Sequence, residues 1–282
     1  MNNFKDMYIY KPTSSSCGRG IKIIGKKDNV NKRAGFLVSK YLEKPHLLRG
    51  YKYDLRIYIV VTCYEPLKAY IFKEGLVRLA TCPYTTNKNS LKKRFVHLTN
   101  YSVNKKNENF VKNVNTAGNN LVGGTTNFKP MDEKDDAESI EADEPPSAMP
   151  FESKWSLKML KEEYERNGID FDDIFNKIKE LCLKTLISVE PHIVSQSRTT
   201  RFRNQCFEVY GFDVLIDETL RPWLLEVNVA PSLSSSSPFD KTVKSMLLSD
   251  TFHLIGFTLF DRQIIHEEQK LQKKRKLIGA AA

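Results

Sequence analysis

Residues 206–233 read CFEVYGFDVLIDETLRPWLLEVNVAPSL, and this stretch predicts a β-hairpin. Residues 217–222 are rich in polar residues, end in Pro, and are typical of a turn. Large apolar side chains take alternate positions on both sides of this turn, as they do in strands. These positions are Phe212, Val214 and Ile216 before the turn, and Trp223, Leu225 and Val227 after it.

The register of this hairpin predicts two carboxylates that face each other. If Ile216 lies opposite Trp223, then Asp213 lies opposite Glu226. Asn228 follows on the same face as Glu226, about 7 Å along the strand. Facing carboxylates repel, so we expect a cation between them. Oxygen-bearing side chains without a nearby His or Cys favour Mg²⁺ or Mn²⁺ over zinc. The alternative is a surface hairpin with solvated polar residues, which is disfavoured because the carboxylates have apolar neighbours.

Residues 8–24, YIYKPTSSSCGRGIKII, predict a strand, a Ser- and Gly-rich loop and a returning strand. Such a loop can surround phosphate groups with backbone N–H groups and with the charges of Lys11 and Arg19. It lacks the GxxxxGK[ST] pattern of a P-loop. Many hairpins have Gly-rich turns, so an ordinary hairpin is the alternative.

Residues 51–61, YKYDLRIYIVV, predict a strand with one apolar face and one charged face, which favours the wall of a cleft over a solvated edge strand. The charged face carries Lys52, Asp54, Arg56 and Tyr58. Arg78 is a lone cation on the apolar stretch EGLVRLAT, and its guanidinium suits a carboxylate. The stretch HLTNYSVNK at 97–105 is compatible with a site loop, in which we interpret His97 as structural.

The remaining pattern predicts a β-rich first third and helices after it. Strands are predicted at residues 7–10, 21–24, 36–42, 68–72 and 76–80, with Gly75 as a turn. Helices are predicted at 153–167, at 170–191 with Asp170 as cap and Pro191 as end, and within 240–260. Residues 112–152 predict a disordered insertion, and residues 263–282 predict a basic tail or helix.

Composition limits the classes of function. The net charge is +10, and because residues 131–145 carry eight carboxylates against Lys134, the rest carries +17. Such a body attracts polyanions, either nucleic acid or an acidic protein tail. Five cysteines without CxxC spacing argue against a disulfide framework or zinc site and fit a cytosolic compartment. No apolar stretch approaches the roughly 20 residues of a membrane span, and the start shows no secretion signal, so we expect a soluble protein without membrane contact.

Six motifs occur in the order seen in the tubulin tyrosine ligase-like proteins, which this chain resembles nearly throughout, outside the acidic insertion. They are KPTSSSCGRGI, LVSKYLEKPHLLRGYKYDLRIYIVVT, EGLVRLAT, HLTNYSVNKKNE, SKWSL and GFDVLIDETLRPWLLEVNVAPSL. The polyglutamylase branch is similar in having EVN, then Val or Ile, before Pro-Ser-Leu. The resemblance implies an α/β (α+β) ATP-grasp fold, with the nucleotide between two β-rich subdomains. It implies a ligase domain at residues 1–262 that lacks the family's N-terminal subdomain, followed by the basic tail.

The resemblance also implies the site residues. ATP would be bound by Lys11, Arg19, Gly20, Ser39, Lys40, Tyr41, Leu42, Lys52, Asp54, Thr99 and Asn100. Magnesium would be bound by Asp213, Glu226 and Asn228, in agreement with the hairpin register. Glutamate would be bound by Arg78, Tyr101, Ser102 and Lys154. Catalysis would depend on Lys52, Arg78, Glu226 and Asn228. Elongating glutamylases resemble one another in a histidine at the position of Val229 and a glutamine at that of Ser39, so the resemblance implies a chain-initiating enzyme.

The implied reaction is the ATP- and Mg²⁺-dependent addition of free L-glutamate, through an isopeptide bond, to glutamate side chains of acidic C-terminal tubulin tails. The acceptor carboxylate would attack the γ-phosphate, and the amine would displace phosphate from the acyl phosphate. We expect a monomer in the cytoplasm and on the cytoskeleton, with the cilium, flagellum or basal body as more specific places. The alternatives are a ligase for tyrosine, glycine or a small molecule, and a catalytically inactive microtubule-binding fragment. Nucleic-acid binding is disfavoured because the basic residues are not interleaved with aromatic ones.

Overall fold

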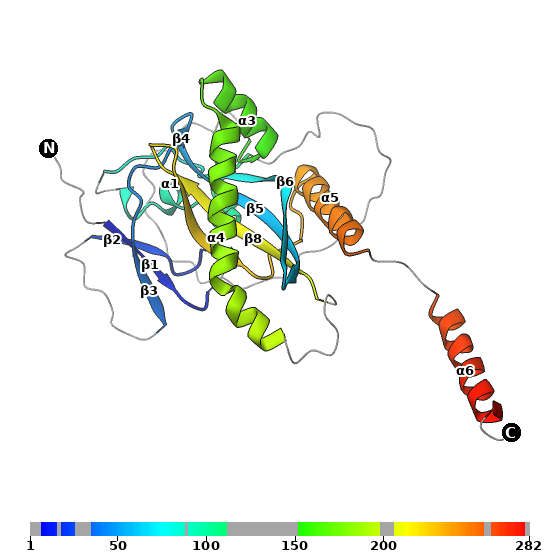
Figure 1. The fold of residues 1–282 in the computed structure, drawn as a ribbon. Helices are drawn as coiled ribbons and strands as arrows, with labels where there is room; N and C mark the ends of the chain where they lie inside the picture. The colour runs from blue at the N-terminus through cyan, green and yellow to red at the C-terminus, as the bar shows by residue number, and fades with distance from the viewer. Residues whose placement is uncertain are drawn as a thin grey trace.

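The Tyr- and Ile-rich strand near the start of the chain is the centre of a small antiparallel sheet (Figure 1). The computed structural model describes residues 7–15, 18–25, 35–87, 90–111, 152–197, 206–256 and 261–279. Residues 276–279 are described by their backbone alone. Strand β1 (Met7–Pro12) lies between β2 (Lys22–Gly25) and β3 (Phe36–Lys40). The predicted strand–loop–strand pattern is therefore confirmed, and β3 ends two residues earlier than expected.

A second, larger antiparallel sheet has the strand order β7-β6-β5-β8-β9, with the short β4 paired beside β5. The bounds are β4 (Leu47–Leu48), β5 (Tyr51–Tyr64), β6 (Leu67–Leu79), β7 (Lys154–Ser156), β8 (Glu208–Ile216) and β9 (Pro222–Asn228). The predicted hairpin is thus β8–β9. It adds to β5, which is the central strand, so residues far apart in sequence are neighbours across one sheet.

The two faces of β5 have different roles, as its alternation predicts. Its odd-numbered residues, such as Leu55 and Ile57, enter the main core with α3 (Leu157–Arg166) and α4 (Phe171–Ser197). Its even-numbered residue Tyr58 joins a smaller core with α5 (Pro238–Ile255). Figure 1 shows α4 lying across the sheet. The charged residues of β5 share the α5 side, so this side carries the candidate site.

The prediction of a turn at Gly75 is wrong, because β6 continues through it as a strand, although its pairing with β5 shifts between Ile71 and Gly75. A Cβ at Gly75 would lie 2.5 Å from the carbonyl oxygen of Arg56 and 3.2 Å from Leu157. Glycine is therefore required here by a close approach of β5 and α3 and not by a turn.

The helix predicted at 153–167 begins later than expected, because Lys154–Ser156 pairs with β6 as strand β7. Ser156 caps α3 by accepting a hydrogen bond from Met159 N (3.0 Å), and Gly168 follows its end with φ of 69°. This difference turns Lys154 into a strand residue directly opposite Arg78.

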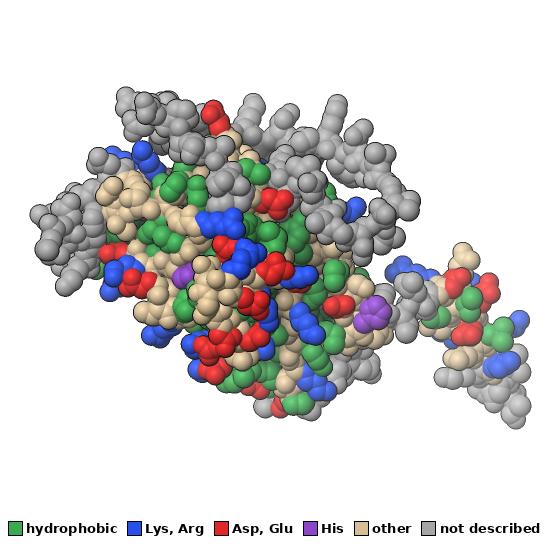
Figure 2. Space-filling model, turned by 90° about the horizontal axis from the view of Figure 1, so that it is seen from above, with side chains coloured by type: hydrophobic (Ala, Val, Ile, Leu, Met, Phe, Trp, Pro, Cys, Tyr) green, Lys and Arg blue, Asp and Glu red, His purple; other side chains and the backbone are tan. Residues whose placement is uncertain are grey.

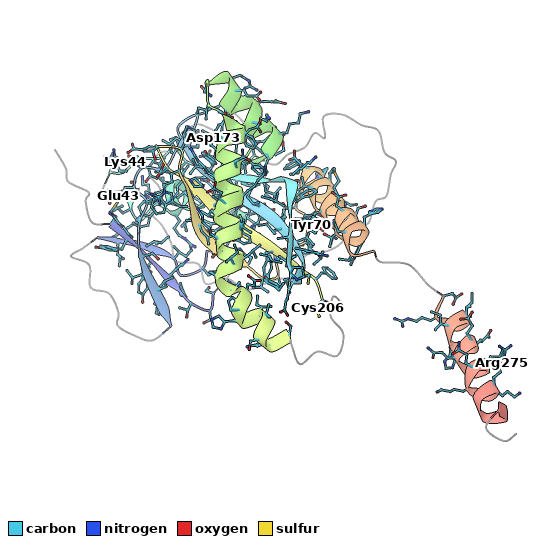
Figure 3. The ribbon with its side chains drawn as sticks, viewed as in Figure 1. Glu43, Lys44, Tyr70, Asp173, Cys206 and Arg275 are labelled. Carbon is cyan, nitrogen blue, oxygen red and sulfur yellow. The ribbon has the colours of Figure 1, made fainter. Side chains whose placement is uncertain are left out.

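The end predicted at Pro191 is also wrong, because α4 continues through it to Ser197. The third helix is confirmed as α5, and its predicted end at 257–260 lies outside the described residues. The predicted basic helix is α6 (Arg262–Gly279), which stands apart from the body, with Arg275 projecting from it (Figures 1 and 3). The predicted insertion at 112–152 lies outside the described residues except for Glu152. Within the described residues, no helix is both long and apolar enough to cross a membrane.

Short contacts join the small sheet to the large one. Glu43 and Lys44 lie in the connection between the two sheets (Figure 3). Glu43 Oε1 accepts a hydrogen bond from Met7 N (3.3 Å), and Lys44 Nζ lies 2.9 Å from Glu218 Oε1 in the hairpin turn. On the face drawn in Figure 2, acidic and basic side chains of the described residues are interspersed, so the positive charge expected for the body does not gather there.

Candidate active site

A β-bulge gives the β8–β9 hairpin its functional register. Ile216 lies opposite Pro222 and not opposite Trp223, so the predicted pairing at the turn is wrong by one residue. The ladder shifts after Val214, and Asp213 then lies opposite Glu226 as predicted. Without the extra residue, Glu226 would face Phe212 and the main core. The bulge therefore turns Glu226 onto the face of Asp213, a common use of bulges at functional sites.

Two arginines from neighbouring strands hold Asp213. Arg56 Nε lies 2.5 Å from Asp213 Oδ1, and Arg78 NH2 lies 2.9 Å from Asp213 Oδ2. Arg78 also forms a forked ion pair with Asp54, with Nε 2.8 Å from Oδ1. Burial opposes ionisation of Asp213, but the charges of Arg78 and Arg56 outweigh it and lower its pKa below the ordinary value. The cations expected against this carboxylate are therefore, in part, arginines.

Glu226 is an exposed residue whose carboxyl group is partly shielded beside Asp213. This partial burial raises its pKa, the charge of Asp213 raises it further, and the charge of Lys11 on β1 lowers it. Asn228 Nδ2 donates to Gly211 O (3.2 Å) and contacts Glu226 Oε1 (3.5 Å), so its amide group lies beside the carboxylate. Within the described residues, no three His, Cys, Asp or Glu side chains form a metal cluster by themselves.

These observations fit a hard divalent cation. Asp213, Glu226 and Asn228 carry carboxylate and amide oxygens, which are the donors that Mg²⁺ prefers. In this structure two arginines hold Asp213, and Asn228 turns its Nδ2 toward Glu226. The raised pKa of Glu226 indicates a place where an added positive charge would be stabilising. The three predicted metal ligands are thus brought together on one face of β8–β9.

Lys52 on β5 is a buried cation next to this cluster. It is 6% exposed, donates to Tyr41 Oη (2.9 Å) and lies 4.5 Å from the centre of the Tyr41 ring. Burial lowers the pKa of Lys52 to about 8, although the Asp54 charge opposes this. His97 Nδ1 lies 3.0 Å from Tyr41 Oη, and burial together with Lys52 lowers the pKa of His97 to about 4. These contacts agree with the structural interpretation of His97. Lys52 is a buried cation whose charge would favour the binding of an anion.

The Ser- and Gly-rich loop meets the HLTN stretch. Arg94 NH2 donates to Gly18 O (2.7 Å), and a Cβ at Gly18 would lie 2.9 Å from Asn100 Oδ1. Asn100 precedes α2 (Tyr101–Asn104), and Thr99 beside it is buried. Arg94 lies in α1 (Arg94–His97). Two motifs separated by about 80 residues are therefore in contact.

The other residues expected to bind ATP lie on β1, on β3 and in the loops beside these strands, and they differ in exposure. Lys11 is on β1, and Gly20 has φ of 72° in a turn packed on Pro12, whereas Arg19 is exposed there. Of residues 39–42, which are also expected to bind ATP, Ser39 and Lys40 end β3 and Leu42 follows in the connection. Tyr41 instead turns into the core, where it contacts Lys52, so its side chain has a structural role.

The residues expected to bind glutamate meet at the β6–β7 edge. Lys154 pairs with Arg78 across the ladder, and its Nζ lies 4.2 Å from the centre of the Tyr101 ring. Lys154 Nζ also donates to Ser236 Oγ (2.8 Å) and lies 3.3 Å from Asp240 Oδ2. Ser102 follows Tyr101 in α2. Arg78 is thereby shared between the carboxylate cluster and this group.

The model of the tubulin-tyrosine ligase family matches residues 1–136 and 133–265 of the chain. The chain belongs to the tubulin-tyrosine ligase family. This family has an ATP-grasp-like fold, and the predicted α+β class is confirmed by the mixed sheets and helices.

Curated relatives in the family cover most of this chain. Human tubulin monoglutamylase TTLL4 is 41% identical over 257 residues, 90% of this chain and 19% of that protein. Tubulin polyglutamylase ttll-5 of Caenorhabditis elegans is 37% identical over 264 residues, 93% of this chain and 32% of that protein. Human tubulin polyglutamylase TTLL7 is 36% identical over 279 residues, 96% of this chain and 28% of that protein. The chain therefore spans about a fifth to a third of the length of these relatives.

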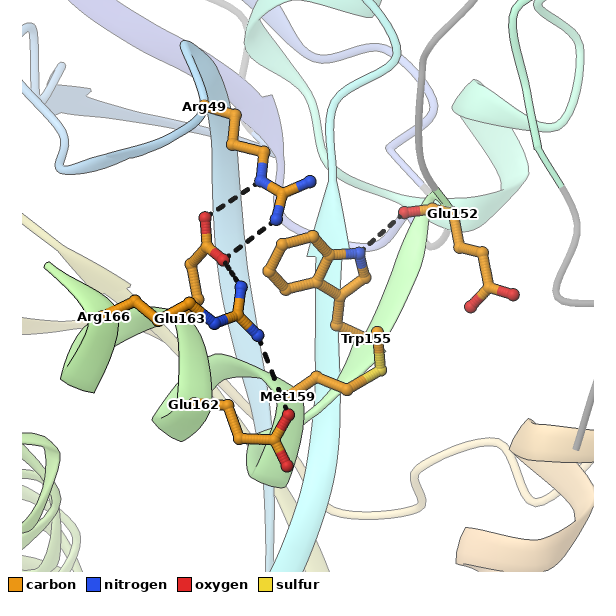
Figure 4. A pocket seen from close by; sticks show the side chains of 7 residues that line it. All are labelled: Arg49, Glu152, Trp155, Met159, Glu162, Glu163 and Arg166. Carbon is orange, nitrogen blue, oxygen red and sulfur yellow. Dashed lines mark hydrogen bonds and ion pairs between the residues drawn. The ribbon is translucent and has the colours of Figure 1, made fainter. Parts of the chain in front are cut away.

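A separate pocket of this tubulin-tyrosine ligase family member does not contain the predicted site residues. It has a volume of about 230 Å³ and is lined by Arg49, Glu152, Trp155, Met159, Glu162, Glu163 and Arg166 (Figure 4). Glu163 holds Arg49 (2.9 Å) and Arg166 (2.6 Å), and the Arg49 guanidinium lies 5.3 Å from the centre of the Trp155 ring. Because neighbouring strand residues point to opposite faces, this pocket lies across β7 from Lys154.

The sequence analysis predicted no role for three residues of the site. Arg56 was placed on the charged face without a role, yet it holds Asp213. Arg94 and Asp240 had no signal of their own, because each acts through a contact with a distant segment. The alternation of the β5 strand could have indicated Arg56, since Arg56 pairs with Asp213 once β8 is placed beside β5.

Proposed function

We propose that this chain is the catalytic core of an ATP-dependent ligase that adds glutamate to glutamate side chains in acidic tubulin tails. The observation that carries the proposal is the cluster of Asp54, Arg56, Arg78, Asp213 and Glu226, in a chain similar to proteins named tubulin glutamylases. A cluster with alternating charges on a rigid sheet can bind phosphate, carboxylate and a cation at once.

Each group of residues has a distinct task in the proposed reaction. Lys52, Lys11 and the loop around Gly20 would bind the ATP phosphates, with Thr99 and Asn100 beside them. Positive charge from Lys52 suits an anion because this lysine is buried without a carboxylate at ion-pair distance among the described residues. The segment 39–42 would border the base.

Asp213, Glu226 and Asn228 would hold Mg²⁺, as their oxygen donors and the raised pKa of Glu226 support. Bound there, Mg²⁺ would supply charge neutralisation for the transferring phosphate group. The chain's own arginines keep Asp213 ionised at neutral pH, so this ligand needs no proton release to bind a metal.

Glutamate would lie at the β6–β7 edge. Arg78 holds Asp54 and Asp213 with its guanidinium, so it would contribute positive charge to an incoming carboxylate, while Lys154, Tyr101 and Ser102 border the same place. The acceptor γ-carboxylate would first take the γ-phosphoryl group from ATP, which gives an acyl phosphate and ADP. The glutamate amine would then attack the acyl carbonyl, form the isopeptide bond, lose a proton and release phosphate. The Val229 side chain, 60% exposed, and Ser39 stand where a histidine and a glutamine were expected for chain elongation, which supports initiation of a branch.

The experiment is an incubation of the full chain with ATP, Mg²⁺, tubulin and either glutamate, tyrosine or glycine, followed by mass spectrometry of the tubulin tails. The proposal expects a mass increase with glutamate alone, and one glutamate per branch. A product with tyrosine or glycine would overturn the choice of amino acid. ATP-dependent thermal stabilisation without any product would instead favour an inactive microtubule-binding fragment.

A further inference from the structure

Asp240, in the first turn of α5, is buried beside the proposed amino-acid site. Its side chain is 2% exposed. Its Oδ2 lies 3.3 Å from Lys154 Nζ and accepts a hydrogen bond from Ser236 N (3.0 Å). Its Oδ1 lies 3.1 Å from Lys244 Nζ. One carboxylate thus joins strand β7, helix α5 and the loop that follows β9.

Capping of α5 does not explain these contacts. Ser237 is the N-cap and accepts from Asp240 N (3.2 Å), so Asp240 occupies the third helical position of a capping motif. In a capping box this carboxylate bonds back to the N-cap N–H. Here it bonds instead to Ser236 N and points at Lys154. The backbone cap and the carboxylate therefore have separate tasks.

Lys154 needs such a partner to remain in place. Its side chain is 7% exposed, and burial lowers its pKa, whereas Asp240 raises it. Ser236 Oγ and Asp240 fix the position of its Nζ on one side, and Tyr101 and Arg78 border it on the other. Lys244 donates to Ser234 O and faces the second oxygen of Asp240, so two lysines share one carboxylate and leave a net positive charge. That surplus suits one incoming carboxylate.

We propose that Asp240 is a positioning residue that holds Lys154 toward the carboxylate of the incoming amino acid. This inference depends on the proposed function, because it assigns Lys154 to the amino-acid site. It predicts an effect on the amino acid and not on the nucleotide, since none of the Asp240 contacts involves Lys52, Lys11 or the loop at Gly18.

The test compares Asp240→Asn with wild type in the full chain. Affinity for free glutamate is measured by titration calorimetry with a non-hydrolysable ATP analogue present, and affinity for that analogue is measured separately. We expect the affinity for glutamate to fall and the KM for glutamate to rise, each on the order of tenfold or more, while the affinity for the analogue stays unchanged. Ser237→Ala is the matched control, because it removes the cap of α5 without touching Lys154 and should lower thermal stability only.

A double mutant separates positioning from general support of the fold. In a Lys154→Met background, Asp240→Asn should cause no further loss of glutamate affinity. Ser236→Ala removes one hydroxyl that accepts from Lys154 and donates to Asp240, and it leaves both charges in place. It should therefore fold even if Asp240→Asn does not, and it should weaken glutamate binding roughly fivefold. An unchanged glutamate affinity in folded Asp240→Asn, or in Ser236→Ala, would overturn the inference. Wild type that binds no glutamate at all would overturn the proposed function itself.

Discussion

Replacement of Lys52 by methionine should stabilise the protein without nucleotide and weaken its binding of ATP. The pKa of Lys52 is lowered by burial from 10.5 to about 8, which corresponds to about 3 kcal/mol of cost for the charged form at neutral pH. Methionine has a similar shape and no charge. Loss of the hydrogen bond to Tyr41 should lower the free energy of unfolding by about 1 kcal/mol, although Tyr41 keeps its contact with His97. The expected net gain is therefore about 2 kcal/mol.

The assay is urea denaturation at pH 7.5, with and without ATP and Mg²⁺. Without nucleotide, the Lys52→Met midpoint should rise, whereas the additional stabilisation that ATP gives to wild type should shrink, because ATP affinity falls on the order of 10²-fold. Lys68→Met is the matched control, since Lys68 is exposed on β6 and neither effect should occur. A variant that is less stable without nucleotide, or that binds ATP as wild type does, would refute the assignment of Lys52 as a cation kept for phosphate.

Three further predictions concern other parts of the site and its support. Gly75→Ala should lower the free energy of unfolding by about 2 kcal/mol, measured by urea denaturation, because its Cβ would lie 2.5 Å from Arg56 O; equal stability would contradict the close approach. The free energy of unfolding should fall by about 2 kcal/mol as pH decreases from 6.5 to 4, because the unfolded chain protonates His97 before the folded one does; a His97→Gln variant with the same pH slope would disprove this. Arg56→Lys should lower kcat on the order of tenfold in the glutamylation assay, because it loses the two-point contact with Asp213, whereas the exposed Arg221→Lys should match wild type.

The sequence predicted the hairpin and its facing carboxylates because both depend on local alternation. Its error at the turn was cancelled by the bulge, for which the Leu-Leu-Glu sequence of β9 gives no signal. The same alternation correctly assigned one face of β5 to the core and the other to the charged cluster. These features need only the period of a strand, which is a property of neighbouring residues.

Features that depend on distant segments were not predictable in this way. Gly75 is a glycine because Arg56 and Leu157 approach it, and Lys154 is in a strand because β6 offers an edge. Local preference favoured a turn and a helix at these places, and tertiary pairing outweighed it. Asp240 likewise stands at the start of a predicted helix without a signal of its own until β7 is placed beside it.

In the proposed ligase, Asp213, Glu226 and Asn228 together form the metal-dependent centre. Its most direct test is the rate of glutamate addition to tubulin tails by Glu226→Gln, compared with wild type and read by mass spectrometry. We expect a loss on the order of 10² or more, with a thermal midpoint no lower than that of wild type, because the amide keeps the shape and removes a charge whose pKa is raised in the folded protein. Turnover close to that of wild type in a folded Glu226→Gln protein would contradict it.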